Sequence, residues 1–160
     1  RQMCIRDSAE THMKTIEREM KELIAADSNI CRNYKLLTSI KGVGPITAIV
    51  MLCSTLNFTK ITDHRKFACY CGLAPFEHSS GTSVRGGCHT SSMANRDIKV
   101  QLNRSALIAI RCDPQLKAYY ERKVAEGKHK FSVLNAVRAK IAARCFAVVR
   151  RGTPYVALQI

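Results

Sequence analysis

The sequence has no long apolar run and few acidic residues. It contains no stretch of about eighteen consecutive apolar residues, so no membrane-spanning helix is predicted. Its first eight residues lack the hydrophobic core of a secretory signal peptide. The 160 residues include 26 Lys and Arg but only 12 Asp and Glu, so the net charge is +14. We therefore expect a cytoplasmic protein that has no membrane partner and that binds a polyanion.

The shortage of acidic residues is concentrated in the carboxy-terminal part of the chain. Residues 1–60 have a charge balance of +3, whereas residues 61–160 have a balance of +11. From Gly127 to Ile160 there are seven basic residues and no acidic residue. Such an uneven excess favours nucleic acid as the partner, because phosphates attract clustered Lys and Arg. A ribosomal or membrane-surface protein would have a similar composition, so charge alone leaves these classes open.

The eight cysteines do not form the C-x-x-C pairs that zinc ribbons and zinc fingers use. Cys69, Cys71, Cys88 and His89 together offer four ligands, but their spacing matches no standard zinc site. Several cysteines fall at apolar-periodic positions, where a thiol packs as a small hydrophobe. We therefore predict that this chain holds no metal or other cofactor and that its thiols stay reduced.

The chain is predicted to be all-α. Residues 9–28 are predicted to form a coiled-coil-like linker helix, because apolar side chains recur there at heptad spacing. These side chains are Met13, Ile16, Met20, Leu23 and Ile24. An amphipathic helix packed on its own domain would have the same pattern. Residues 1–8 resemble a translated sequencing adapter and are predicted to be an artefact or a fragment end.

A glycine-rich turn separates two short helical segments near residues 33–53. Gly42-Val43-Gly44 precedes Pro45, and proline is favoured at the first residue of a helix. We predict a helix-hairpin-helix motif, in which glycines let the backbone approach a phosphate and helix amides point toward it. Lys41 and the two glycines would then contact the nucleic-acid backbone rather than its bases. An ordinary helical corner that needs two glycines is the alternative.

Four further helices are predicted. They cover about residues 63–71, 98–113 and 116–125, and a long last helix follows an N-cap at Ser132. Their expected buried residues are Phe67, Tyr70 and Leu73, then Ile98, Leu102, Ala106 and Ala109, and finally Val133, Val137, Ile141, Cys145 and Val148. Lys140, Arg144 and Arg151 share another face of the last helix, which we predict to bind nucleic acid.

The segment from Ala74 to Ser92 lacks periodicity and contains five serines and three glycines. A loop of this length inside a helical domain is long enough to suggest a function. His78 precedes Ser79 and Ser80, but adjacency in sequence does not supply hydrogen-bond geometry. We therefore predict a solvated histidine rather than a general base.

The order of these features resembles one family. The quoted patterns are L-L-x-S-I-x-G-V-G-P from Leu36 to Pro45, F-x-x-Y-x-G-L-A-P from Phe67 to Pro75, S-S-G from Ser79 to Gly81, and then Ser91 and Asn95. Over about residues 30–156 the chain is similar to the C-terminal domain of DEDD-type insertion-sequence transposases, the insertion sequence one-ten family, and to their Piv-like DNA-invertase relatives. The segments Asp113–Lys128 and Val133–Arg138 resemble those of a Bacteroides-like branch.

The resemblance implies a fragment of a two-part bacterial enzyme. The part that it lacks would be an amino-terminal domain of RNase H-type fold, which binds divalent metal, expected to be Mg²⁺, through four carboxylates. The present part would bind DNA and supply the serine nucleophile of transposition, Ser80 or, as the next choice, Ser79. A guide RNA is a second expected partner, and the amino-terminal helix would join copies into a homo-oligomer. The isolated chain is expected to be inactive.

The residues expected to contact nucleic acid are Lys41, Gly42, Gly44, Arg85, Arg96, Lys99, Lys140, Arg144 and Arg151. The chain departs from the family between Thr90 and Asn95, where the lysine and glycine of many members are absent. It also has Gly87-Cys88-His89 where basic residues are common, which would weaken phosphate binding beside the serine. Two alternatives are a non-catalytic helix-hairpin-helix nucleic-acid-binding module and a partner-binding protein whose first helix dimerises.

Overall fold

The computed structural model describes residues 2–76, 79–80, 84–85, 89–91 and 94–157, and these are mostly helical. Within them lie seven helices and four strands of two residues each. The helices are α1 (Gln2–Ala26), α2 (Ser28–Thr38), α3 (Pro45–Thr55), α4 (His64–Tyr70), α5 (Arg96–Cys112), α6 (Pro114–Ala125) and α7 (Lys130–Arg151). The strands are β1 (Pro75–Phe76), β2 (Ser79–Ser80), β3 (Val84–Arg85) and β4 (His89–Thr90). The predicted predominance of helix is confirmed.

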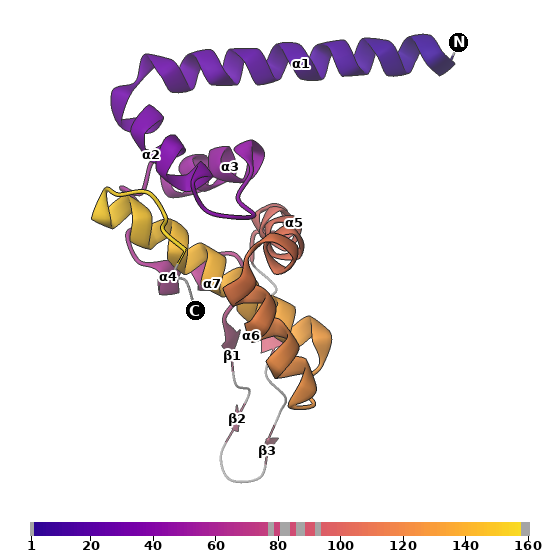
Figure 1. Ribbon diagram of the computed structural model, residues 1–160, viewed down its shortest axis with the longest axis vertical. Helices are drawn as coiled ribbons and strands as arrows, with labels where there is room; N and C mark the ends of the chain where they lie inside the picture. Colours follow the sequence, from indigo (N-terminus) through magenta and orange to yellow (C-terminus); the bar gives the residue numbers. More distant parts are fainter. Residues whose placement is uncertain (1, 77–78, 81–83, 86–88, 92–93, 158–160) are drawn as a thin grey trace.

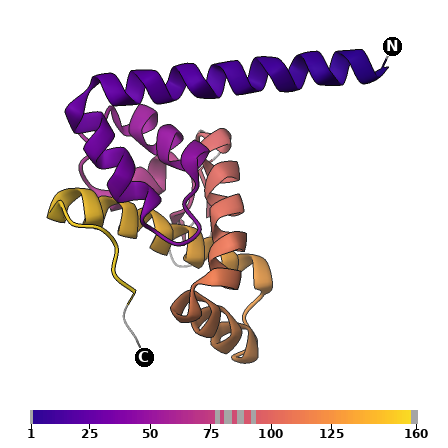
Figure 2. The same ribbon diagram turned by 45° about the horizontal axis from the view of Figure 1, so that its top comes forward.

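Helix α1 extends from the rest of the molecule as a long arm, with the amino-terminus at its far end (Figures 1 and 2). It covers residues 2–26, so it includes most of residues 1–8, the segment predicted to be an artefact or a fragment end. Asp27 ends the arm and caps α2, because its carboxylate accepts hydrogen bonds from two amides of the first turn. Along α1, Met13, Ile16 and Leu23 are 60%, 49% and 72% exposed. The chain's own domain therefore leaves much of this apolar seam uncovered.

The core lies where α5 and α7 pack against each other, with α2, α3, α4 and α6 around them. Every apolar residue predicted for the inner faces of α5 and α7 is buried: Ile98, Leu102, Ala106, Ala109, Val133, Val137, Ile141, Cys145 and Val148. Phe146 of α7 adds an aromatic cluster, with its ring centroid 4.9 Å from that of Phe58 and 5.3 Å from that of Phe67. The helical periodicities are therefore confirmed as packing faces.

Two local predictions are wrong. Helix α7 begins at Lys130 after His129, so Ser132 lies inside its first turn and is not the N-cap. Tyr70, predicted to be buried, is 43% exposed. It lies in the last turn of α4, where the fully buried Phe67 already occupies the side that faces α7. Because one short helix buries only one face, Tyr70 is left toward solvent.

The segment predicted as an irregular loop contains paired strands in its described parts. Strand β1 pairs antiparallel with β4, placing Pro75 opposite Thr90 and Phe76 opposite His89. Strand β2 pairs antiparallel with β3, placing Ser79 opposite Arg85 and Ser80 opposite Val84. Strands β2 and β3 lie farther from the helices than β1 does (Figure 1). We call these four strands the ribbon; with two residues per strand it is no substantial sheet, as predicted.

Candidate nucleic-acid interface

The two glycines of the α2–α3 turn have different roles. Gly42 has a φ of +91°, and a Cβ there would lie 2.7 Å from both the Ala109 Cβ and the Ser105 carbonyl oxygen of α5. A larger residue would therefore be strained and would collide with α5. Gly44 has extended backbone angles, and a Cβ there would have no neighbour within 4 Å. Of these two glycines, Gly44 is the one that leaves open space for a ligand to approach the backbone.

The start of α3 can face an anion. Pro45 is the first residue of the helix, as predicted, and no side chain caps its first turn. Amides in the first turn of a helix lack intrahelical partners and carry partial positive charge. Lys41 is exposed in the preceding turn. Thr47 Oγ1 lies 3.0 Å from Ser105 Oγ, which ties this turn to α5.

The candidate nucleophiles Ser79 and Ser80 form strand β2 of the ribbon. The register brings Arg85, a predicted phosphate contact, opposite Ser79. His78 and Gly81, which flank the serine pair, lie outside the described residues. The strand pairing therefore places Arg85 next to the predicted nucleophile pair, at the end of the ribbon that lies far from the helices (Figure 1).

Arg96 and Lys99 lie in the first turn of α5. Asn95 caps this helix by accepting hydrogen bonds from the amides of Asp97 and Ile98. Arg96 is exposed, whereas Lys99 is half-buried and its Nζ donates to the Gly72 carbonyl oxygen at 2.9 Å. Burial lowers the pKa of Lys99, and the charges of Arg138 and Arg96 lower it further. These cations are thus close enough to repel one another.

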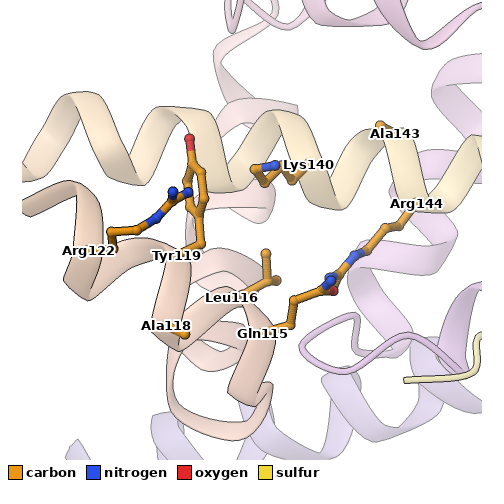
Figure 3. Close-up of a pocket in the computed structure, with 8 residues that line it drawn as sticks. All are labelled: Gln115, Leu116, Ala118, Tyr119, Arg122, Lys140, Ala143 and Arg144. Carbon is orange, nitrogen blue, oxygen red and sulfur yellow. The ribbon is translucent and has the colours of Figure 1, made fainter. Parts of the chain in front are cut away.

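On α7, Lys140 and Arg144 line a pocket of about 570 Å³ between α6 and α7 (Figure 3). Lys140 Nζ lies 4.4 Å from the centre of the Tyr119 ring, and the Arg122 guanidinium carbon lies 5.9 Å from the same ring. The described residues that line this pocket include no carboxylate. An aromatic ring beside two cations in such a pocket could bind a phosphate or stack on a base.

Arg144 is engaged within the fold. Its Nη1 donates to Asp113 Oδ2 at 2.6 Å, its Nη2 donates to Gln115 Oε1, and its guanidinium lies over the Tyr155 ring. Asp113 is only 1% exposed. Burial raises the pKa of Asp113, but hydrogen bonds from Arg144 and from the amides of Leu116 and Gln115 outweigh it and hold the pKa below its ordinary value. The Arg144 charge is therefore largely neutralised by Asp113.

Arg151 lies at the exposed end of α7. Its Nε donates to Thr153 Oγ1 at 2.6 Å and its Nη2 to the Pro154 carbonyl oxygen at 3.3 Å. Periodicity places Lys140, Arg144 and Arg151 on one face, yet their charges are not equivalent. Lys140 and Arg151 contact only neutral groups among the described residues, whereas Arg144 is paired with a carboxylate.

Arg138 is a cation that the sequence analysis did not single out. It lies on α7, and its guanidinium donates to the side-chain oxygens of Asn103 and Asn135. Asn135 in turn donates to the carbonyl oxygen of Leu73, which shortly precedes the ribbon. Asn103 and Arg138 are 35 residues apart. The sequence places Asn103 and Arg138 on two predicted amphipathic helices, but it does not predict that their side chains form a hydrogen bond.

The described residues also include no group of three or more His, Cys, Asp and Glu side chains placed to hold a metal ion. Cys71, one of the four ligands considered above, is buried and donates from its Sγ to the Phe67 carbonyl oxygen. Burial raises the pKa of the Cys71 thiol to about 12. No helix in the described part of the chain is long and apolar enough to span a membrane.

Comparison with known proteins identifies the family. Residues 34–121, more than half of the chain, match the model of the transposase IS116/IS110/IS902 family. The chain belongs to this family.

A protein of insertion element IS110 from Streptomyces coelicolor is 39% identical over 121 residues, covering 75% of this chain and 29% of the relative. A pilin gene-inverting protein of Moraxella bovis is 23% identical over 141 residues, covering 88% of this chain and 44% of the relative. A probable family 20 transposase of Pseudomonas aeruginosa is 28% identical over 103 residues, covering 64% of this chain and 29% of the relative.

The match to this transposase family covers only part of the candidate interface. The matched residues 34–121 include the α2–α3 turn, the ribbon and all of α5, but end before α7. The chain spans less than half the length of these relatives, from 29% to 44%. Lys140, Arg144 and Arg151 therefore lie outside the region that the family model matches, while the serine pair and Lys99 lie inside it.

Proposed function

We propose that this chain binds DNA and supplies the serine nucleophile of an insertion-sequence transposase or recombinase. In this proposal it is the C-terminal part of a DEDD-type enzyme, whose amino-terminal part binds Mg²⁺. The family match carries the proposal, because it covers the serine ribbon together with the α2–α3 turn and the basic start of α5. We assign the divalent metal to the amino-terminal part, and the described residues of this chain include no group of three or more His, Cys, Asp and Glu side chains that could hold a metal ion.

The chemistry assigned to the ribbon is a phosphoryl transfer. The serine Oγ attacks a DNA phosphorus, so that an Oγ–P bond forms while one P–O bond to deoxyribose breaks. A base takes the serine proton, and the departing oxygen takes up a proton and becomes a DNA hydroxyl. The phosphoserine link keeps the phosphodiester bond energy for rejoining. We assign Ser80 as the nucleophile, because the family that the chain resembles has its nucleophilic serine just before the loop glycine, here Gly81. Ser79, the other residue of β2, is the next choice.

A covalent adduct tests this assignment. The chain, extended by the upstream coding region of its gene, is incubated with labelled element-end DNA, the guide RNA and Mg²⁺, and adducts are separated on a denaturing gel. We expect Ser80→Ala to abolish the adduct and to change DNA binding by less than about threefold, because one hydroxyl contributes little to binding. Ser83→Ala, in the same segment, is the matched control and should keep the adduct.

Comparing the adducts of the two serine variants identifies the nucleophile. If Ser79→Ala abolishes the adduct and Ser80→Ala does not, the nucleophile is Ser79. If the adduct survives both substitutions, the serine mechanism is refuted and the alternative function gains support. That alternative is a non-catalytic nucleic-acid-binding module built on the α2–α3 turn, and the observation in its favour is the open space around Gly44 at the uncapped start of α3. We propose that this turn is a helix-hairpin-helix.

Two partners complete the proposal. A guide RNA would use the same positive surface, since its phosphates attract the same cations as those of DNA. A second copy of the protein would cover the exposed seam of α1, where Met13, Ile16 and Leu23 lie at heptad spacing on one side of the arm. The exposure of these side chains, on a helix whose amino-terminal part extends beyond the domain, supports a homo-oligomer (Figure 2).

A further inference from the structure

Three cationic side chains gather where the ribbon joins the helices. Arg96 and Lys99 come from the start of α5, and Arg138 comes from the middle of α7. The Arg138 Nε and Nη2 donate to Asn103 Oδ1 at 3.1 and 2.7 Å, and its Nη1 donates to Asn135 Oδ1 at 3.3 Å. The guanidinium is therefore held in place by two carboxamides.

The same network is fastened to the segment that leads into the ribbon. Lys99 Nζ donates to the Gly72 carbonyl oxygen at 2.9 Å, and Asn135 Nδ2 donates to the Leu73 carbonyl oxygen at 2.8 Å. Two consecutive carbonyl groups thus accept from α5 and from α7, and β1 begins two residues later at Pro75. This arrangement fixes the positions of the cations relative to the foot of the ribbon.

The charges in this cluster lack a neutralising partner among the described residues. Every acceptor named above is a neutral oxygen, and no described carboxylate forms an ion pair with Arg96, Lys99 or Arg138. Burial and the charges of Arg138 and Arg96 lower the pKa of Lys99. Arg96 and Lys99 also lie at the amino-terminal end of α5, where the helix dipole disfavours cations. A bound anion would relieve each of these unfavourable terms.

The cluster has hydrogen-bond donors to spare. An arginine side chain carries five N–H groups and a lysine ammonium carries three. Three Arg138 donors and one Lys99 donor are used by described residues, and Arg96 donates to none of them. Guanidinium and ammonium groups are the side chains that bind phosphate oxygens most strongly.

We propose that Arg96, Lys99 and Arg138 form a phosphate-binding site that holds one phosphodiester of the bound nucleic acid at the foot of the serine ribbon. Asn103 and Asn135 are positioning residues, because they orient Arg138 without contacting the phosphate. The inference rests on the proposed function, because this site would anchor the DNA backbone near the phosphate that the serine attacks. Arg138 and its two asparagines are new to the interface.

The salt dependence of DNA binding tests the site. Binding of the 160-residue chain to a fluorescent 20-base-pair duplex is measured by anisotropy across a series of KCl concentrations. If about six phosphates are contacted, the slope of log K against log salt is about −5, from roughly −0.9 per phosphate. We expect Arg96→Gln, whose side chain forms no hydrogen bond or ion pair with the described residues, and Lys99→Gln each to reduce the steepness by about 0.9. Arg111→Gln removes an equal charge from the exposed far end of α5 and should leave the slope unchanged.

Asn103→Asp provides a variant that does not depend on deleting a cation. A carboxylate at this position would pair with Arg138 from within the fold and compete with the phosphate. We expect Asn103→Asp to raise the thermal unfolding midpoint and to reduce the steepness of log K against log salt by about 0.9. If Arg138 has a purely structural role, the substitution should raise the midpoint and leave DNA binding unchanged.

The outcomes separate the two proposals. If the unmodified chain binds DNA and Arg96→Gln, Lys99→Gln and Asn103→Asp all keep its slope, the phosphate site is refuted. It is also refuted if Arg111→Gln weakens binding as much as Arg96→Gln and Lys99→Gln do. If the unmodified chain shows no salt-dependent binding to duplex or to single-stranded RNA of equal length, the proposed function itself fails.

Discussion

The buried ion pair between Asp113 and Arg144 is expected to be the most sensitive polar contact of the fold. Asp113 joins α5 to α6: its Oδ1 accepts from the amides of Gln115 and Leu116 at 2.9 and 3.2 Å, and its Oδ2 accepts from Arg144. Asp113→Asn keeps an oxygen for the two amides, since Asn is as good an N-cap as Asp. It replaces only the oxygen that faces Arg144, and it removes the charge.

The expected loss of unfolding free energy is about 3 kcal/mol, the low end of the range for breaking a buried pair by removing one partner. The low end applies because the Arg144 side chain, 16% exposed, keeps its bond to Gln115 and its place over Tyr155. With an m-value of about 2 kcal/mol/M, the urea midpoint should fall by about 1.5 M at pH 7. Glu121→Gln, which removes an exposed carboxylate 3.9 Å from Lys117 on α6, should cost less than about 0.5 kcal/mol.

The stability difference should also depend on pH in a defined direction. Because the folded-state pKa of Asp113 lies below its ordinary value of 3.8, its contribution is fully present above about pH 4. It is lost as the pH falls through the folded-state pKa. The urea midpoints of the unmodified chain and of Asp113→Asn should therefore differ equally at pH 7 and pH 5 and converge toward pH 2. Equal effects of Asp113→Asn and Glu121→Gln, or a difference independent of pH, would refute the reasoning.

Two further predictions concern packing. Gly42→Ala should lower the unfolding free energy by about 2–4 kcal/mol, because the new Cβ collides with α5 and the backbone is left-handed. Gly44→Ala should cost about 1 kcal/mol or less, because a Cβ has open space there and the only expected loss is that Ala is a poorer N-cap than Gly. Similar urea midpoints for the two variants would contradict this. With a thiol reagent at pH 8, the exposed Cys69 should react readily. Cys71 and Cys145 should react only on unfolding, because burial raises their pKa to about 12. Fast labelling of Cys71 or Cys145 in the native protein would contradict their burial in the core.

Much of the fold could be predicted because its determinants are local. The apolar stripes of α5 and α7 follow from residues three and four apart, which share a helix face whatever surrounds it. Pro45 and Pro114 are the first residues of their helices, and Gly72 and Gly152 follow helix ends with positive φ. These signals lie within a few residues of the boundary that they mark, so one sequence suffices to find them.

The candidate site was less predictable because its contacts join distant residues. Asp113 and Arg144 are 31 residues apart, and nothing in the periodicity of α7 distinguishes Arg144 from Lys140. Arg138 and Asn103 meet only because α5 and α7 pack together. The serine pair was found through resemblance, and its pairing with Arg85 requires the ribbon register, which a segment rich in serine and glycine does not reveal.

Helix α5 relates the two candidate phosphate contacts to each other. Ser105 and Ala109 of α5 pack against Gly42 and so position the α2–α3 turn, while Lys99 and Asn103 position the cluster at the foot of the ribbon. The distance along the helix between these two groups of residues is on the order of 10 Å at 1.5 Å per residue. Because both are attached to one helix by buried or hydrogen-bonded contacts, their separation is set by the fold. A phosphate held at the turn would thereby set which phosphate reaches the ribbon.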